Sequence, residues 1–358
     1  MGRVGWPVRD LIVAGGGPIG LATATYAALA GLDVGVREPR RGVIDNACGE
    51  GLMPSAVADL VALGVALEGH PISGIRYLDG SRVAEARFSG GTGLGVRRTT
   101  LHDALRRRLA DAEVPTSTTA VREIVDHGDH LLVDGEPTRF LIGADGLRSP
   151  VRRLVGLGVP STSSRRYGLN CHVEIAPWTS FVEVHWARSG EAYVTPVSDT
   201  TVGIALLSAE RRTFDDLIQD FPALVTRLSG RALSRVRGAG PLRQRTRRRV
   251  AGRVLLVGDA AGYVDALTGE GIALGLAQAR AAVSAVVDAA PERYEADWRK
   301  LTRRHDLLTR GLVTATGIPV VRQRIVVAAR LLPWVFGTAV NQLARPPGAG
   351  SAAVPHDH

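Results

Sequence analysis

The glycine motif near the start of the chain, Gly15-x-Gly17-x-x-Gly20, constrains the fold more than any other feature of the sequence. It follows the apolar residues 10–14, which predict a short buried strand, and precedes the alanine-rich residues 21–29, which predict a helix. In such a turn the first glycine permits the tight bend, the second lets the backbone approach a pyrophosphate, and the third allows close packing of the helix. The motif indicates a dinucleotide-binding turn, with a glycine-rich loop that holds no ligand as the alternative.

An acidic residue stands at the end of the strand–helix–strand unit that contains the glycine motif. Residues 33–38 predict a second strand, and Glu38 stands at its end. A carboxylate there accepts hydrogen bonds from ribose hydroxyls and repels a 2′-phosphate, which favours FAD or NAD over NADP. The neighbouring Arg37 argues the other way, and a plain surface position for Glu38 is the alternative. This unit assigns to the cofactor Gly15, Gly17, Pro18, Ile19, Gly20 and Glu38.

The composition narrows the classes of function. The 358 residues are 45% hydrophobic and 22% charged, which is a globular composition. Cys48 and Cys171 are the only cysteines, so we expect no disulfide framework, no metal site and a cytoplasmic location. The formal charge of +9 permits anionic partners, but no nucleic-acid-binding motif accompanies it. We expect a small-molecule substrate and no nucleic acid. The basic run at 243–249 predicts a solvated face, or contact with an anionic membrane.

The order of predicted elements indicates two interleaved domains. Strand-like segments with a hairpin signal at Asp79-Gly80 interrupt the first domain, and apolar strands at residues 140–142 and 254–257 return to it. We therefore expect a mixed α/β fold, in which a Rossmann-like domain is interleaved with a mixed-sheet substrate domain and followed by C-terminal helices. The expected boundaries are 1–70, 97–160 and 250–290 for the first domain, 71–96 and 161–249 for the second, 291–345 for the helices, and 346–358 for a disordered tail.

Two later motifs separate FAD from NAD. Each places an aspartate, Asp145 or Asp259, after an apolar strand and beside a glycine, where a carboxylate can hold the ribityl hydroxyls of a flavin nucleotide. Together with the first glycine motif, and in this order, they resemble the p-hydroxybenzoate hydroxylase-like flavoproteins. That superfamily includes single-component aromatic hydroxylases and geranylgeranyl reductases. The resemblance covers nearly the whole chain and implies noncovalent FAD.

The resemblance also implies which further residues contact the cofactor. Asp259 would bind the ribityl chain, Arg98 would contact FAD, and Asp145 would lie near the pyrophosphate. Residues 268–272 would open a helix whose N-terminus faces the pyrimidine edge of the flavin, where negative charge gathers on reduction. The cofactor residues expected from these motifs are Arg98, Asp145, Gly146, Gly258, Asp259, Gly269, Glu270, Gly271 and Ile272.

The catalytic residues stay open at this point, with four candidates. Glu50 and Asp265 flank the expected flavin face, where each could serve as an acid or base, or could instead accept hydrogen bonds from backbone N–H groups at helix starts. Cys48, in a loop that resembles the reductase branch, could have a redox role or be a buried structural cysteine. Tyr193 lies on the expected roof of the substrate pocket and is either structural or catalytic.

Two enzymatic reactions fit this reading. The first, and the narrow favourite, is a monooxygenase in which NAD(P)H reduces FAD and an aromatic, polyketide or lipid-like molecule is hydroxylated. The second is a reductase of carbon–carbon double bonds in a prenyl chain or similar lipid, favoured by residues 48–51 and 268–272. A noncatalytic flavin-binding protein is the third hypothesis. NAD(P)H is the expected transient electron donor, and the location is cytoplasmic or peripheral to the membrane.

Overall fold

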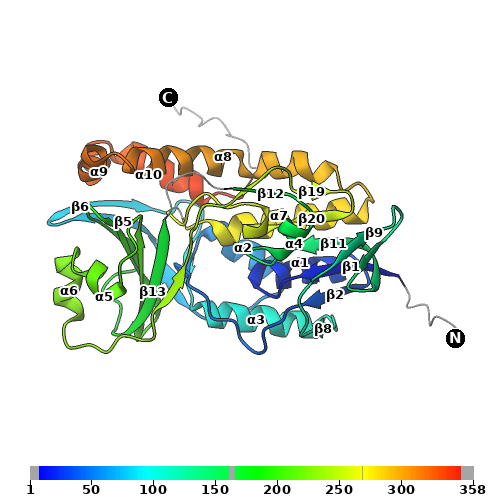
Figure 1. Ribbon diagram of the computed structural model, residues 1–358. Helices are drawn as coiled ribbons and strands as arrows, with labels where there is room; N and C mark the ends of the chain where they lie inside the picture. The colour runs from blue at the N-terminus through cyan, green and yellow to red at the C-terminus, as the bar shows by residue number, and fades with distance from the viewer. Residues whose placement is uncertain (1–7, 161–165, 268, 348–358) are drawn as a thin grey trace, which may run out of the picture.

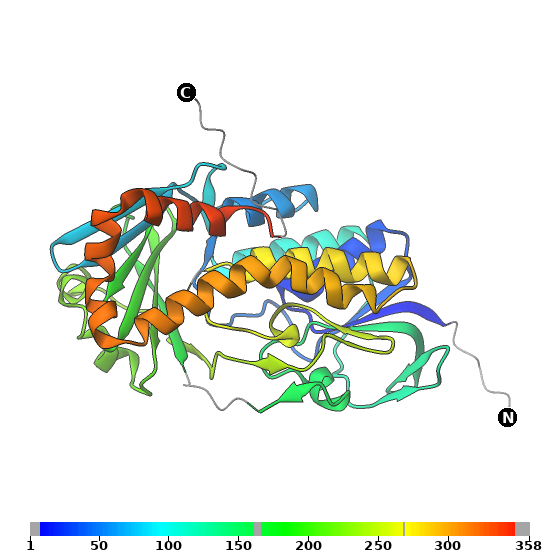
Figure 2. The same ribbon diagram turned by 90° about the horizontal axis from the view of Figure 1, so that it is seen from above.

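Two large sheets lie side by side in this protein, and C-terminal helices run across both (Figures 1 and 2). The computed structural model describes residues 8–160, 166–267 and 269–347. The mixed α/β fold class predicted from the sequence is confirmed.

The first large sheet carries the glycine turn. Its main path runs β19 (Val250–Ala251), β20 (Val254–Leu256), β11 (Glu136–Gly143), β1 (Arg9–Ala14), β2 (Val34–Arg37) and β8 (Thr116–Ser117), and β10 (Leu131–Val133) and β9 (Ile124–Asp126) extend from β11. The strands from β20 to β8 are parallel, and such strands are buried on both faces. Leu11, Ile12 and Val13 of β1 are accordingly all buried. Three helices cover this sheet, α1 (Pro18–Leu29), α3 (Arg98–Asp111) and α7 (Gly271–Val287).

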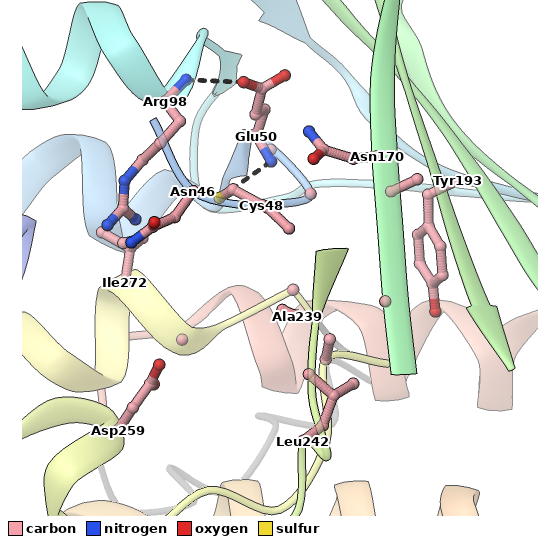
Figure 3. A pocket seen from close by; sticks show the side chains of 18 of the residues that line it. Asn46, Cys48, Glu50, Arg98, Asn170, Tyr193, Ala239, Leu242, Asp259 and Ile272 are labelled. Atoms are coloured by element: carbon pink, nitrogen blue, oxygen red, sulfur yellow. Dashed lines mark hydrogen bonds between the residues drawn. The ribbon is translucent and has the colours of Figure 1, made fainter. Parts of the chain in front are cut away.

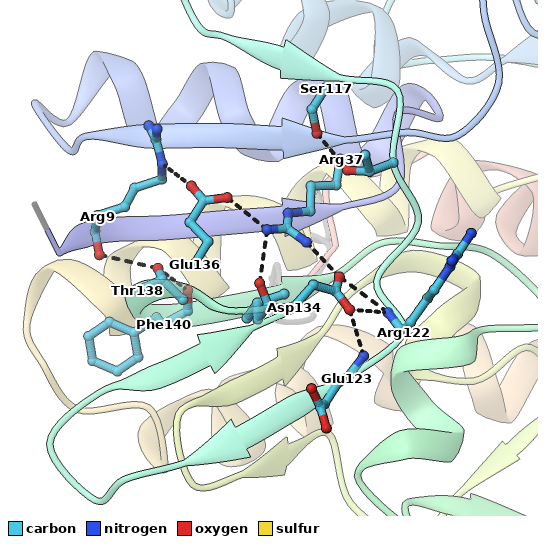
Figure 4. Close-up of polar contacts among 11 residues, drawn as sticks. Arg9, Arg37, Ser117, Arg122, Glu123, Asp134, Glu136, Thr138 and Phe140 are labelled. Atoms are coloured by element: carbon cyan, nitrogen blue, oxygen red, sulfur yellow. Dashed lines mark hydrogen bonds and ion pairs between the residues drawn. The ribbon is translucent and has the colours of Figure 1, made fainter. Parts of the chain in front are cut away.

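A buried ion-pair cluster fastens the strands of this sheet together (Figure 4). The guanidinium of Arg37 on β2 donates to Asp134 at 2.6 Å and to Glu136 at 2.7 Å, and Glu136 also accepts from Arg9 of β1. Burial raises the pKa of Glu136, but the bonds from both arginines outweigh it and hold that pKa below its usual value. The hydrogen bonds of the Arg37 guanidinium are therefore taken up by the β10–β11 hairpin of this sheet. Asp134 and Gly135 form the turn of that hairpin, both with positive φ, the conformation that Asp-Gly favours in a tight hairpin.

The second large sheet forms the other half of the molecule. It runs in the order β17 (Arg237–Ala239), β13 (Tyr167–Glu174), β16 (Thr201–Ser208), β15 (Gly190–Ser198), β14 (Phe181–Trp186), β5 (Gly74–Asp79) and β6 (Arg82–Arg87). The predicted hairpin at Asp79-Gly80 joins β5 to β6. One face packs its apolar residues on α5 (Phe214–Ile218) and α6 (Pro222–Leu228). The opposite face turns toward the first sheet and the C-terminal helices.

Short elements fill the space between the two large sheets. They are a three-stranded sheet of β3 (Gly51–Leu52), β7 (Gly93–Gly95) and β4 (His70–Ile72), the pair β12 (Gly158–Val159) and β18 (Arg245–Thr246), the helices α2 (Pro54–Ala62) and α4 (Pro150–Leu154), and the 3-10 turn η1 (Gly258–Ala261).

The C-terminal helices differ from the sequence prediction in one respect. The periodicity predicts a second long helix near residues 321–343, but the structure has two helices there, α9 (Pro319–Leu331) and α10 (Pro333–Ala344). They meet at 102°, because Pro333 has no N–H for the helical ladder and clashes with the preceding turn. The preceding helix, α8 (Arg293–Thr316), spans both halves of the molecule (Figure 2). Within the described residues no single helix is long and apolar enough to cross a membrane, although the bent α9–α10 pair has the length and composition to do so.

Candidate active site

A cavity of about 680 Å³ lies between the two large sheets, and most of the predicted site residues line it (Figure 3). The predicted cofactor residues on its wall are Gly17, Pro18, Ile19, Arg98, Asp145, Gly146, Gly258, Asp259, Gly269, Gly271 and Ile272. The catalytic candidates on its wall are Cys48, Glu50 and Tyr193. The other predicted site residues lie behind the wall instead, namely Gly15, Gly20, Glu38, Asp265 and Glu270.

The glycine turn is built by close backbone contacts that no side chain would permit. Gly15 has φ +106°, and a Cβ there would lie 2.5 Å from the carbonyl oxygen of Ala144. A Cβ on Gly20 would lie 1.8 Å from the carbonyl oxygen of Gly15. Gly17 differs, because a Cβ there would meet only the tip of Arg98, at 3.9 Å. Gly17 is the N-cap of α1 and no side chain caps this helix, so its free N–H groups face the cavity and can bind an anion.

Glu38 is held at the end of β2 by two donors. Its carboxylate accepts from the backbone N–H of Gly16 at 2.8 Å and from the guanidinium of Arg40 at 2.7 Å. Burial raises the pKa of Glu38, but these bonds outweigh it and lower the pKa overall. Arg40 lies between Glu38 and the cavity and lines it. Sequence reasoning missed Arg40; its position two residues past the acidic residue was the available signal.

A second missed residue, His102 of α3, supports the glycine turn from behind. Its Nδ1 accepts from the N–H of Ile44 at 3.2 Å, so its Nε2 carries the hydrogen and donates to the carbonyl oxygen of Gly16 at 2.8 Å. The side chain is buried, and burial lowers its pKa. A neutral histidine in one tautomer therefore fixes the turn.

Asp259 presents a half-buried carboxylate to the cavity without a hydrogen-bond partner among the described residues (Figure 3). Burial raises its pKa, and the charges of Arg98 and Arg152 oppose that rise. Arg152 also ties the two aspartate motifs together: it donates to the carbonyl oxygens of Ala260 and Leu147. An acceptor with free lone pairs in this position suits a row of ribityl hydroxyl donors.

Two further groups on the wall lack partners. The buried Nε of Arg98 and the buried Oδ1 of Asp145 make no hydrogen bond within the described residues. The other oxygen of Asp145 accepts from the N–H of Val151 at 2.9 Å, which places the carboxylate at the start of α4. Buried polar atoms without partners are rare in folded proteins, so these two groups fit a bound polar ligand.

The start of α7 closes one end of the cavity. Gly269 has φ +68°, a conformation that favours glycine, and Gly271 begins the helix on the cavity wall. The side chain of Glu270 points elsewhere, to His305 of α8 at 2.5 Å, and it does not cap the helix. The first N–H groups of α7 are therefore available to a negative edge of a ligand. Thr268, the first residue of this predicted segment, lies outside the described residues.

Glu50 joins three elements at the cavity wall. It has φ +59°, between two glycines, and its carboxylate accepts from the N–H of Arg98 at 2.8 Å. The other oxygen lies 2.6 Å from Nε2 of His172 on β13. Of the two roles left open by the sequence, this is the geometry of an acceptor at a helix start, with an added link to the second sheet.

The remaining catalytic candidates have different surroundings. Cys48 lines the cavity, and burial raises the pKa of its thiol, which therefore stays protonated at neutral pH. Tyr193 also lines it and donates its hydroxyl to the carbonyl oxygen of Leu267 at 2.8 Å. Asp265 is buried beside Arg166, with 3.5 Å between the charged atoms, and accepts from the N–H of Leu267. It does not reach the cavity.

Beyond these residues the cavity continues into an apolar end that the sequence did not reveal. The second sheet forms one of its walls, and the C-terminal helices form the other. They include Val182, Val184, Leu207, Leu312, Val340 and Leu343.

Taken together, these groups fit FAD. Arg40, held in place by Glu38, would lie at the adenosine ribose, the start of α1 would hold the pyrophosphate, Asp259 the ribityl chain, and the start of α7 the pyrimidine edge. The fit rests on the unpartnered polar atoms and on the uncapped helix starts at the cavity wall.

Comparisons with known proteins agree with this geometry. Residues 9–297 match the model of a family described as an FAD binding domain. The chain is 30% identical over 339 residues to a menaquinone reductase of Mycolicibacterium smegmatis, covering 83% of this chain and 80% of that protein. It is also 30% identical over 309 residues to the ubiquinone hydroxylase UbiL of Rhodospirillum rubrum, covering 75% and 70%. A solved flavoprotein/dehydrogenase from Cytophaga hutchinsonii has a TM-score of 0.76 and 18% identity, covering 94% of this chain and 97% of that one, and shows the fold alone.

Proposed function

Because this chain belongs to the FAD-binding-domain family of p-hydroxybenzoate hydroxylase-like flavoenzymes, we propose that it reduces a carbon–carbon double bond in a largely apolar, prenyl-type substrate. The apolar end of the cavity carries this proposal. A site of this kind takes a ligand with a long hydrocarbon part, because it offers hydrophobic contact and few polar anchors.

The residues around the cavity support reduction in two ways. Bound and reduced FAD supplies two electrons and one hydrogen, so saturation of a double bond needs one further proton. The Cys48 thiol is a protic group on the wall, and burial raises its pKa, so it is protonated at neutral pH and could supply that proton. The helix starts of α1 and α7 would hold the cofactor between them, and a bound apolar substrate would displace water from the reacting carbons.

Hydroxylation is the second candidate, and it is the reaction that the sequence alone places first. It is supported by the similarity to the ubiquinone hydroxylase UbiL and by a shorter match to 3-hydroxyphenylpropionate hydroxylases over 43% of this chain. The apolar end of the cavity argues against a compact ring as the substrate, and the longer match to the menaquinone reductase favours reduction over hydroxylation. In both cases NAD(P)H is proposed as a transient donor that binds beside the same cavity.

One experiment separates the two reactions. Enzyme loaded with FAD and chemically reduced is mixed with menaquinone in detergent without oxygen, and the product is analysed by mass spectrometry. A gain of two hydrogen atoms is the expected result. A product that forms only in air and gains one labelled oxygen atom from ¹⁸O₂ would favour the hydroxylase instead.

The FAD site is tested by a separate variant. Asp259→Asn removes the charge of the acceptor that faces the ribityl chain, and we expect FAD affinity to fall roughly tenfold or more. Fluorescence titration of the apoprotein measures it. Asp129→Asn is the control, because Asp129 lies in an exposed turn beside His130, away from the cavity. Equal FAD affinity in both variants would remove Asp259 from the cofactor site.

A further inference from the structure

A surface of large apolar side chains runs from the start of α9 to its bend into α10. We call it the elbow patch and define it as Val320, Val321, Leu331, Leu332, Trp334 and Val335. Leu331 is 74% exposed, Trp334 71% and Val320 68%. Such large apolar side chains are normally buried, and a cluster of them on a surface indicates a contact with something apolar.

The amphipathic pattern of α9 explains why the elbow patch stays exposed. Val326 and Ala329 on its inner side pack into the core formed with the second sheet. Arg322, also on the inner side, pairs with the buried Glu191 of β15 at 3.5 Å. Val320, Ala328 and Leu331 recur at three- to eight-residue spacing on the opposite side, where they are exposed. The helix is thus anchored by one face, while the other has no partner within the part of the chain that the structure describes.

The C-terminal segment that carries the elbow patch has basic but no acidic residues over fifty positions. Residues 307–356 contain five arginines and no aspartate or glutamate. Two of these arginines, Arg324 and Arg330, are exposed on α9 among the apolar residues. A helix with exposed apolar residues, a tryptophan and arginines is typical of segments that lie in the interface of an anionic bilayer. The charge complementarity selects anionic lipid over a neutral apolar partner.

The elbow patch lies close to the apolar end of the cavity. Leu312 of α8 and Val340 and Leu343 of α10 line that end, and the same two helices flank α9 on one side of the molecule (Figures 1 and 2). A membrane on this side would bring lipid to the part of the protein under which the apolar cavity lies.

We propose that the elbow patch docks this enzyme on the surface of an anionic lipid bilayer, with α9 and the start of α10 lying in the interface. Membrane binding does not require catalysis, so this proposal can be tested independently of the proposed reaction.

Flotation with vesicles tests the proposal on the full chain loaded with FAD. The protein is expected to float with phosphatidylcholine vesicles that contain roughly a quarter phosphatidylglycerol, and much less with phosphatidylcholine alone or at high salt. Leu331→Glu combined with Trp334→Glu should lower the partition coefficient at least about tenfold, because the apolar area is lost and negative charge is added. Arg324→Gln with Arg330→Gln should lower binding to anionic vesicles only.

Leu29→Glu is the matched control, because Leu29 is also an exposed leucine, 58% exposed, at the last position of a helix. It should bind vesicles like the unaltered protein, and all variants should keep their FAD content and melting temperature. Absence of flotation, or equal flotation of the elbow and control variants, overturns the proposal. So does analytical ultracentrifugation that shows a dimer which the elbow variants dissociate, since the patch would then bind a second copy of this chain.

Discussion

Two glycines of the same motif differ sharply in the space around them, and this gives a residue-scale prediction. Gly20→Ala would place a Cβ 1.8 Å from backbone, so we expect a loss of about 3 kcal/mol or more in the free energy of unfolding. Gly17→Ala meets nothing closer than 3.9 Å and should fold, but its methyl group would intrude on the bound pyrophosphate and weaken FAD binding. Urea denaturation and FAD titration measure the two effects. Similar stability of both variants would contradict the described contacts.

His102 gives a pH-dependent prediction. Its native pKa lies below the ordinary value of 6.5, so the unfolded chain binds a proton that the native state does not. The contribution of His102 to stability is therefore complete above pH 6.5 and is lost as the pH falls toward the native pKa. Melting temperatures between neutral and mildly acidic pH should fall less steeply for His102→Gln than for the unaltered protein. Parallel curves would show that another group controls the acid limb.

Two neighbouring arginines show what sequence could and could not predict at the residue scale. The glycines, Glu38 and Asp259 follow from local spacing and apolar strands, and most of them lie where the motifs suggest. Arg37 and Arg40 could not be distinguished from sequence, because the partners of Arg37 lie in a hairpin that follows about a hundred residues later, a separation of 97 in the case of Asp134. Only the folded sheet decides which arginine faces the cavity.

At the scale of elements, Arg37 should matter for stability and Arg40 for the cofactor. Arg37→Met leaves the partly buried Asp134 and Glu136 without their shared cation, and the loss of these charged hydrogen bonds costs about 1–3 kcal/mol. Arg40→Gln should cost less stability than Arg37→Met, since the Arg40 side chain is 51% exposed and the backbone N–H groups of Gly16 and residue 40 still donate to Glu38, but it should weaken FAD binding. Denaturant unfolding and FAD titration of both variants test this separation. A stability loss as large in Arg40→Gln would refute it.

The break at Pro333 shows a limit of periodicity as a guide to helices. Apolar residues recur at helical spacing on both sides of this proline, so the pattern predicts one helix. The proline was visible in the sequence, but the angle at which the two helices meet depends on Val326 and Phe336 packing into the second sheet. The length and amphipathic character of this helical segment were predictable from the sequence, whereas the direction that the chain takes after Pro333 was not.

At the scale of the whole molecule, Glu50 connects the two halves. It joins the start of α3 to His172 on the second sheet, and both side chains are buried. Glu50→Ala should destabilise the protein by about 2–3 kcal/mol, because the N–H of Arg98 and the ring of His172 lose their acceptor. Flavin release and tryptophan fluorescence should report one unfolding transition in the unaltered protein and separated transitions in the variant. Coincident transitions in both would show that Glu50 does not couple the halves.

The interleaved architecture was predictable because each return to the first sheet is marked by an apolar strand and a glycine-aspartate motif. The apolar end of the cavity was not, since it is formed by Val184 and Leu207 of one sheet and by Leu312 and Val340 of distant helices. Strand register and helix direction decide which of these side chains face one another, and neither can be read from local patterns.

The order of strands in the first sheet also bears on how the chain reaches its native state. The central strand β1 pairs with β11, and β11 with β20, so neighbouring strands come from residues 9–14, 136–143 and 254–256. During synthesis β1 must wait for more than a hundred residues before its second edge is paired, and such non-local pairing slows folding and leaves an apolar edge open to aggregation. The aspartate and helix start that complete the cofactor site emerge last of all. Flavin can therefore stabilise only the finished sheet, and expression under flavin limitation should raise the fraction of the protein that aggregates.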